Sequence, residues 1–338
     1  MLRRTFLTTA AVLLAGTVLS TALLAGTAHA QLKEINFGII STESSANLKT
    51  IWQPFLADMQ KQTGKKINAF FAPDYAGVIE GMRFNKVQVA WYGNASAIQA
   101  VDRAEGEVFV QTTSKDGAPG YWSLLLVHKD SPINSLKDVI GAPGKYTFGN
   151  GDPNSTSGFL VPSFYVFGQN NIDPRKHFSR MVTGSHEVNA LAVANKQVDV
   201  ATNNTENLER LQKTQPAKAA ELKAIWKSPL IPSDPIVWRK DLSDADKKII
   251  KTFFMSYGTK ASGKSADQLA KETKVLADLQ WGAFKESSNK QLIPIRQLAL
   301  FRDKIKLEGD ANMAADEKAK KIAEIDGKLA DLNKQMGS

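Results

Sequence analysis

Residues 148–162 read FGNGDPNSTSGFLVP, and this stretch decides our interpretation of the fold. An apolar approach, a glycine-rich bend and a hydroxyl cluster before a second apolar segment predict a strand, a turn and the start of a helix. Asn154 or Ser155 is the expected N-cap, which leaves the next backbone N–H groups without intrahelical acceptors. With the positive end of the helix dipole and the hydroxyls of Ser155, Thr156 and Ser157, these donors predict an anion cradle for a tetrahedral oxyanion.

The same stretch also fits an ordinary capped helix or a nucleotide-binding loop. Gly149 and Gly151 favour the cradle, because glycines let the backbone approach a ligand closely. A Walker A loop requires a Lys after its second glycine, and no Lys follows Gly158. The dinucleotide fingerprint requires a third glycine at position 154, where the chain has Asn. We therefore expect a phosphate-like group rather than a nucleotide.

Residues 1–30 have the pattern of an export signal peptide. Arg3 and Arg4 form a positive n-region, residues 10–24 are an apolar run, and residues 28–30 are a cleavage site of the A-x-A type. A general secretory signal and a twin-arginine signal both fit the two arginines. No Cys follows for a lipid anchor, and no later apolar run reaches membrane-spanning length. We expect a soluble mature protein in the periplasm.

The composition narrows the class of protein further. The chain has 43 Lys and Arg against 34 Asp and Glu, a net charge of +9, which becomes +7 once Arg3 and Arg4 leave with the signal peptide. These charges are spread along the chain rather than gathered in a basic stripe with aromatics, so no nucleic-acid partner is expected. The absence of cysteine means that packing, not disulfides, must stabilise an exported chain.

The order of apolar segments predicts an α/β fold with two lobes. Strand and helix patterns alternate along residues 34–91, which is typical of a parallel sheet with both faces covered. Ligands in such folds bind beyond the carboxyl ends of the strands, where Tyr75, Trp91 and Tyr92 lie. Trp91 and Tyr92 also fit a core position, so they are left out of the predicted contacts.

The chain is predicted to cross between the two lobes twice. Lobe 1 comprises residues 31–121 and 236–300, and lobe 2 comprises residues 122–235 with the anion cradle. Three prolines within residues 228–238 suit an extended return segment. Two crossover strands between two α/β lobes predict a hinged clamshell with its site in the cleft.

The tail, residues 301–338, is predicted to be a charged helix. Its apolar residues Ile322, Ile325, Leu329 and Leu332 form one narrow stripe. The stripe either packs on the helix's own domain or forms a homodimer contact.

Seven runs along the chain carry a resemblance to a known family. They are NFGIISTE (36–43), FAPDYAG (71–77), AWYGN (90–94), PGYW (119–122), the stretch 148–162, VDVATNNTEN (198–207) and WKSPLIP (226–232). With these runs the chain resembles the phosphonate-binding periplasmic proteins of phosphonate ABC transporters, of the type that binds 2-aminoethylphosphonate. The resemblance covers Ile35 to about Leu300 and excludes the signal peptide and the tail.

The resemblance implies a type II solute-binding clamshell that delivers 2-aminoethylphosphonate to an ABC permease, with no catalytic residue, metal or cofactor. It implies that the phosphonate group lies on the helix N-terminus at Ser155, Thr156 and Ser157. The other implied pocket residues are two tyrosines and two carboxylates that hold the ligand's ammonium group: Tyr75, Tyr121, Glu206 and Asp234.

The chemistry of these residue types supports the same ligand. Two buried carboxylates would repel a plain dianion, but a ligand ammonium between them makes each a charge-assisted partner contributing about 1.5–3 kcal/mol. Taken singly, Glu206 also fits a solvated loop acid and Asp234 a turn residue before Pro235. The pair therefore predicts selectivity for zwitterionic phosphonates.

Two other functions compete with transport. A phosphonate-processing enzyme would need a nucleophile with a base, or metals. His128, His177 and His186 lack ligand spacing and are expected to be surface or packing residues, and Ser155 has no base near it in sequence. The second alternative is a ligand-sensing domain for another oxyanion, which would have the same clamshell.

Overall fold

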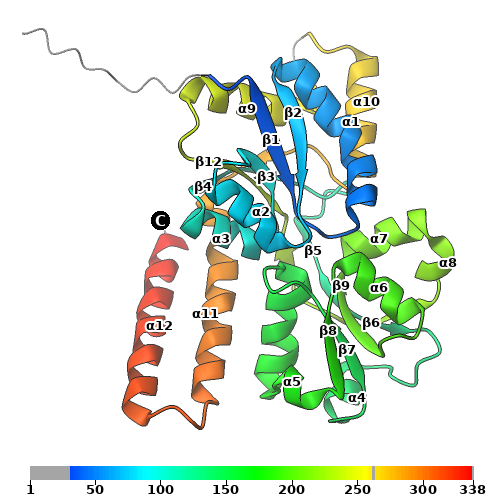
Figure 1. Cartoon of the computed structure of the whole chain (residues 1–338), viewed down its shortest axis with the longest axis vertical. Coiled ribbons are helices and arrows are strands. Elements are labelled where there is room, and N and C mark those ends of the chain that lie inside the picture. The colour runs from blue at the N-terminus through cyan, green and yellow to red at the C-terminus, as the bar shows by residue number, and fades with distance from the viewer. Residues whose placement is uncertain (1–30, 261–262, 337–338) are drawn as a thin grey trace, which may run out of the picture.

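The computed structural model describes residues 31–260 and 263–336 (Figure 1). The predicted signal peptide, residues 1–30, lies outside this part. Two mixed sheets, joined by a two-stranded crossover, organise the chain. We call the part built on the six-stranded sheet lobe 1 and the part built on the five-stranded sheet lobe 2.

The sheet of lobe 1 is mixed rather than fully parallel. In spatial order its strands are β13 (Lys285–Glu286), β4 (Gly106–Gln111), β12 (Pro235–Arg239), β3 (Val89–Trp91), β1 (Glu34–Ile39) and β2 (Lys66–Phe71). β1 pairs in parallel with β2 and β3, as the strand–helix alternation predicts. β12 runs antiparallel to β3 and β4, because it enters the sheet from the edge at which the parallel strands end.

Helices cover both faces of this sheet, and aromatic side chains fill the space between. The helices are α1 (Ser45–Thr63), α2 (Tyr75–Arg83), α3 (Asn94–Arg103), α9 (Asp244–Ser256) and α10 (Ala266–Asp278). α1 begins at the N-cap Ser44 and ends at Gly64, whose φ of 69° suits glycine. Its buried residues Trp52 and Phe55 pack against Phe37 of β1.

Lobe 2 holds the predicted anion cradle. Its strands, in spatial order, are β10 (Leu222–Lys227), β6 (Ser123–His128), β9 (Val200–Asn204), β7 (Thr147–Asn150) and β8 (Arg180–Thr183). Its α-helices are α4 (Leu136–Ile140), α5 (Pro174–His177), α6 (His186–Ala194), α7 (Thr205–Thr214) and α8 (Pro216–Ala219). The polar residues that follow β9 begin α7, because the Asn204 side chain caps that helix.

A continuous helical segment follows the cradle. It consists of η1 (Thr156–Leu160), η2 (Ser163–Phe167) and η3 (Gly168–Asn170). Leu160 and Val161 belong to the same apolar core as the residues of lobe 1, so this segment lies between the lobes.

The two crossover segments pair with each other between the lobes. They are β5 (Gly120–Tyr121) and β11 (Ile231–Pro232), which run antiparallel. A Cβ at Gly120 would lie 1.9 Å from the Ile231 carbonyl oxygen, so only glycine permits this pairing.

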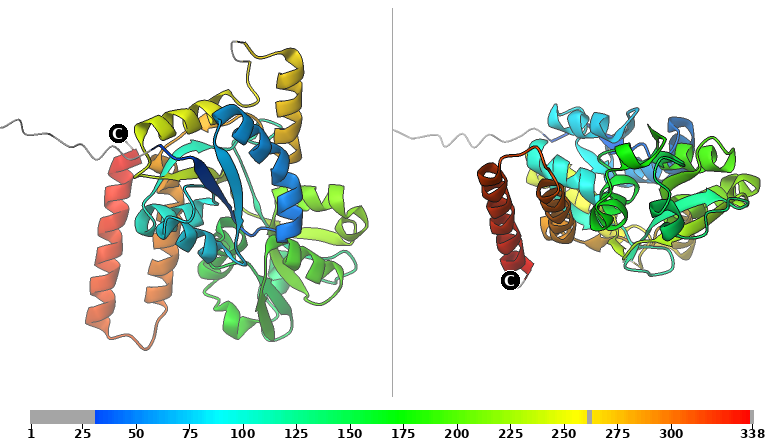
Figure 2. Two further views of the ribbon diagram at one scale, coloured as in Figure 1. Left: turned by 45° about the horizontal axis from the view of Figure 1, so that its top comes forward. Right: turned by 90° about the horizontal axis from the view of Figure 1, so that it is seen from below.

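The tail differs from the single helix predicted over residues 301–338. α11 (Ile293–Glu308), which follows η4 (Asn289–Leu292), ends before Gly309, and α12 (Ala315–Met336) returns along it as a hairpin (Figures 1 and 2). Ile325 and Leu329 of the predicted stripe are buried in this hairpin. The stripe therefore packs inside the chain. Among residues 31–260 and 263–336, the structure has no helix that is both long and apolar enough to span a membrane.

Candidate ligand-binding site

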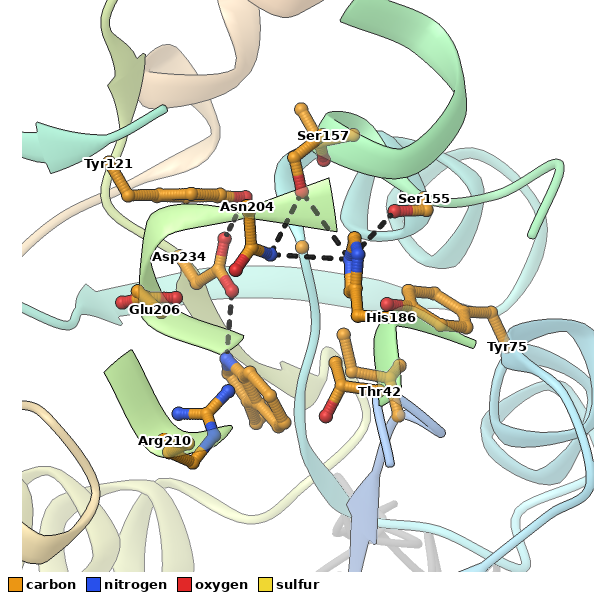
Figure 3. Close-up of a pocket in the computed structure, with 14 residues that line it drawn as sticks. Thr42, Tyr75, Tyr121, Ser155, Ser157, His186, Asn204, Glu206, Arg210 and Asp234 are labelled. Atoms are coloured by element: carbon orange, nitrogen blue, oxygen red, sulfur yellow. Dashed lines mark hydrogen bonds between the residues drawn. The ribbon is translucent and has the colours of Figure 1, made fainter. Parts of the chain in front are cut away.

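A polar pocket lies between the lobes, beyond the carboxyl ends of their parallel strands (Figure 3). It contains about 270 Å³ of empty space, part of which is open to solvent. The structure brings all seven predicted site residues to its wall: Tyr75, Tyr121, Ser155, Thr156, Ser157, Glu206 and Asp234. It adds residues that were not predicted as contacts: Ile40, Thr42, Trp91, Gly93, His186, Asn204 and Arg210.

The cradle is built by Ser155 and two glycines. Ser155 is the N-cap: its hydroxyl oxygen accepts a hydrogen bond from Gly158 N at 2.9 Å. Pro162 has no N–H to donate to the Gly158 carbonyl four residues earlier, and Gly151 N donates to that carbonyl instead, at 3.1 Å. A Cβ at Gly151 would lie 2.5 Å from Gly158, so the loop can close over the helix only with glycine here.

The three hydroxyls of the cradle have different partners. Ser157 Oγ accepts from Asn204 Nδ2 at 3.1 Å, within lobe 2. Thr156 Oγ1 accepts from Ala95 N of lobe 1 at 2.8 Å, so it bridges the lobes. Thr156 and Ser157 occupy the first helical positions, where N–H groups have no intrahelical acceptor. The cradle can therefore offer several hydrogen bonds to an oxyanion.

His186 was expected to be a surface or packing residue, but it lies in the pocket wall. Its Nε2 is 3.5 Å from Ser155 Oγ and 3.4 Å from Ser157 Oγ, so a base is near Ser155 in space although none is near in sequence. Burial, together with the positive charge of Arg210, lowers the pKa of His186 to about 3 and keeps the ring neutral.

The hydrogen bonds around His186 also fix its proton. Asn204 Oδ1 accepts from Asn207 N at 2.7 Å, which orients the amide so that Nδ2 lies 3.2 Å from His186 Nε2. An amide nitrogen is only a donor, so Nε2 is an acceptor and Nδ1 carries the hydrogen. Nδ1 has no hydrogen-bond partner among the described residues, so no carboxylate orients the ring there as in a Ser-His-Asp triad.

The opposite end of the pocket carries the two carboxylates. Asp234 is 6% exposed, and its Oδ1 accepts from Tyr121 OH at 2.9 Å while Oδ2 accepts from Trp91 Nε1 at 3.0 Å. Burial and the nearby charge of Glu206 raise the pKa of Asp234 well above its ordinary value. Burial likewise raises the pKa of Glu206, in the first turn of α7, to about 6. The positive charge of Arg210 lowers the pKa of both carboxylates, but burial outweighs it, so the ionised carboxylates remain costly here.

Trp91 and Tyr92 have different roles, although they are adjacent. Trp91 is a buried core residue that also reaches the pocket wall, where its indole N–H donates to Asp234. Tyr92 is fully buried, and its hydroxyl donates to the Val78 carbonyl at 3.0 Å inside lobe 1. A side chain at the end of a strand can point into the pocket or into the core of the lobe, and the sequence alone did not show which of the two residues does which.

Arg210 and Thr42 were not predicted from the sequence as pocket residues. Arg210 lies one turn after Glu206 on α7, a spacing that places both on one helix face, and it pairs with Glu43 of lobe 1. Thr42 follows β1, and its buried hydroxyl has no hydrogen-bond partner among the described residues. Tyr75 is the first residue of α2; its N–H donates to Asp152 of lobe 2 at 3.1 Å, and burial raises the pKa of its phenol.

Two α/β lobes with a paired crossover and a polar pocket between them define a type II periplasmic solute-binding protein. The chain belongs to the family of periplasmic substrate-binding proteins of phosphonate ABC transporters, whose model matches residues 37–292. It is 58% identical over 316 residues to the phosphonates-binding periplasmic protein of Escherichia coli (strain K12), covering 94% of this chain and 90% of that relative.

Solved structures agree with this assignment. The binding-protein component of an ABC phosphonate transporter from Pseudomonas aeruginosa is 60% identical and superposes with a TM-score of 0.86, covering 91% of this chain and 99% of that one. PhnD1 from Prochlorococcus marinus, in complex with methylphosphonate, shares the fold with a TM-score of 0.68 at 21% identity, covering 79% and 97%. The protein is therefore the periplasmic phosphonate-binding component of an ABC transporter, and not an enzyme.

Proposed function

We propose that the preferred ligand is 2-aminoethylphosphonate, which the protein delivers to its permease. The observation that carries this proposal is the pairing of a neutral hydroxyl cradle with two carboxylates in one pocket. The phosphonate group would lie on Ser155, Thr156 and Ser157. The ammonium group would lie between Glu206 and Asp234.

The pKa shifts of the carboxylates support an ammonium ligand. Burial raises the pKa of both Glu206 and Asp234, which means that Arg210 and the hydrogen bonds of Asp234 compensate their ionised forms only in part. A ligand ammonium supplies that compensation, whereas phosphate or methylphosphonate would add negative charge beside them. The penalty of leaving these carboxylates unpaired disfavours ligands without an amine.

The two tyrosines complete the proposed contacts from the other side of the pocket. Tyr121 is held by its bond to Asp234, and Tyr75 lies in lobe 1, opposite the cradle. We infer that the ligand binds first to the cradle and that closure then brings Tyr75 over it. Closure shifts a population between conformations, and the closed form is the one presented to the permease. Superimposable scattering profiles with and without saturating ligand would refute this closure step.

Isothermal titration of residues 31–338 tests the ligand. The titrants are 2-aminoethylphosphonate, methylphosphonate and phosphate, measured in parallel. We expect the first to bind at least two orders of magnitude more tightly, which is about 2.7 kcal/mol. Comparable binding of all three would leave the cradle in place and refute ammonium recognition.

A homodimer through the C-terminal hairpin is the remaining proposal on partners. Ile325 and Leu329 are buried against α11, so the contact must use other residues of the hairpin. Phe301 on α11 is 44% exposed and could supply an apolar contact. Light scattering should give a dimer mass for the full chain and a monomer mass for Phe301→Ser. A monomer mass for the full chain would refute the dimer.

A further inference from the structure

Two carboxylates that do not line the pocket connect the lobes. One belongs to lobe 1 and binds lobe 2, and the other belongs to lobe 2 and binds lobe 1. Glu43 follows β1 in lobe 1, and its Oε1 accepts from Arg210 Nε and, at 3.4 Å, from Asn207 Nδ2, both on α7 of lobe 2. Glu187 lies in α6 of lobe 2, and it accepts from Ser44 N at 2.8 Å and from Asn47 Nδ2 at 2.6 Å, both in lobe 1. We call Glu43 and Glu187 the interlobe carboxylates.

Each interlobe carboxylate directly follows a residue of the pocket wall. Glu43 follows Thr42, and Glu187 follows His186. Arg210, the partner of Glu43, lines the pocket itself. The interlobe carboxylates therefore secure the two walls that must meet around a ligand, without touching the ligand.

Each interlobe carboxylate gains partners for its charge when the lobes meet. Both side chains are buried at the interface. Glu43 has the guanidinium of Arg210. Glu187 has the positive N-terminal ends of two helices: it is in the first turn of α6, and it binds the N-terminal residues of α1 from the other lobe. A buried carboxylate that loses one partner is costly, so these contacts depend on correct closure.

We propose that Glu43 and Glu187 are positioning residues that set phosphonate affinity by stabilising the closed arrangement of the lobes. This rests on the proposed closure, but not on the proposed preference for an amine. Because neither Glu187 nor its partners line the pocket, its removal should weaken every phosphonate by the same factor, whereas removing Glu43 also frees the charge of Arg210 inside the pocket. Because the contacts join the lobes and are not inside one, their removal should act on ligand dissociation rather than on folding.

The test compares Glu43→Gln and Glu187→Gln with a matched control, Glu209→Gln. Glu209 also crosses the interface, to Lys115 at 2.6 Å, but the two side chains are 45% and 34% exposed. An exposed pair of this kind contributes little. We expect the dissociation constants of both interlobe variants to rise about ten- to a hundredfold, from charge-assisted bonds. Because Glu209 also raises the pKa of Glu206, the control is measured with methylphosphonate, for which its dissociation constant should change less than about twofold.

Three measurements separate positioning from a merely structural role. Stopped-flow binding should show a faster dissociation rate with an unchanged association rate, and thermal unfolding without ligand should match the wild type. In Glu187→Gln, the ratio of the dissociation constants for methylphosphonate and 2-aminoethylphosphonate should stay at its wild-type value. An unchanged affinity in both variants, or an equal loss of ligand-free stability, would overturn the proposal.

Ammonium recognition and the positioning role can be refuted separately. If wild-type protein binds methylphosphonate as tightly as 2-aminoethylphosphonate, ammonium recognition fails, while both interlobe variants should still weaken both ligands. If the interlobe variants change only the ratio between the ligands, Glu43 and Glu187 act on the amine site, and the positioning role is refuted.

Discussion

Replacing Glu206 by Gln should stabilise the ligand-free protein and weaken its binding of 2-aminoethylphosphonate. Burial raises the pKa of Glu206 from 4.5 to about 6. At about 1.36 kcal/mol per pKa unit, the ionised side chain destabilises the folded protein by about 2 kcal/mol at neutral pH. Gln has nearly the same shape and no charge, so the variant should lack this penalty.

The sign of the pH dependence follows from the direction of the shift. The folded state holds the Glu206 proton more tightly than the unfolded state does. The stabilisation is therefore fully present below pH 4.5 and is lost as the pH rises through about 6. The difference in unfolding free energy between Glu206→Gln and wild type should grow by about 2 kcal/mol over this range.

The affinity of Glu206→Gln for 2-aminoethylphosphonate should fall, although its stability rises. With the ammonium between Glu206 and Asp234, losing one charge-assisted bond costs about 1.5–3 kcal/mol, or roughly ten- to a hundredfold in the dissociation constant. Methylphosphonate has no ammonium and should bind the variant at least as well as the wild type.

Urea unfolding at pH 4 and pH 7, without ligand, measures the stability of wild type and variant. Isothermal titration at pH 7 with both phosphonates measures the affinity. Our reasoning is refuted if the stability difference between variant and wild type is independent of pH. It is also refuted if methylphosphonate loses as much affinity as 2-aminoethylphosphonate.

Three further outcomes are expected. Asp234→Asn removes the acceptor of one of its two buried bonds along with the charge, so titration should show at least a tenfold loss for 2-aminoethylphosphonate and little for methylphosphonate. Gly151→Ala places a Cβ 2.5 Å from Gly158, so calorimetry should show a loss of about 1–3 kcal/mol in stability, with weaker binding of every phosphonate. In wild type, the affinity for 2-aminoethylphosphonate should rise from pH 5 to pH 7, because Glu206 must release its proton to bind an ammonium; a flat profile in titrations at both pH values would contradict this.

Local patterns made much of the fold predictable. The strand–helix alternation predicted along residues 34–91 includes α2, whose cap and apolar spacing lie within a few residues of one another. Ser155 was one of two expected N-caps, and its hydroxyl does accept from Gly158. The local geometry of residues 148–162 was predictable because the glycines, the cap and the hydroxyls all lie within one stretch.

The remainder depends on contacts between distant residues. Arg210 is held in the pocket wall by Glu43, which is 167 positions away in the sequence. His186 lies in the pocket because the strand before it places it beside Ser155. The antiparallel direction of β12 follows from its entry out of lobe 2, which no local pattern records. The turn at Gly309 was not predicted, because the residues on both sides of it have the composition of a helix.

The placement of the two carboxylates connects ligand selection with closure. Glu206 belongs to α7 of lobe 2, whereas Asp234 is fixed to lobe 1, where its backbone carbonyl accepts from Thr112 N at 2.8 Å and its side chain binds Trp91. On our proposal, an ammonium between them holds one partner from each lobe, while the cradle holds the phosphonate in lobe 2. A ligand with both charges thus adds a bond across the interface that a plain phosphonate cannot form. The same buried charges that destabilise the empty pocket then favour the closed form only when an aminophosphonate compensates them.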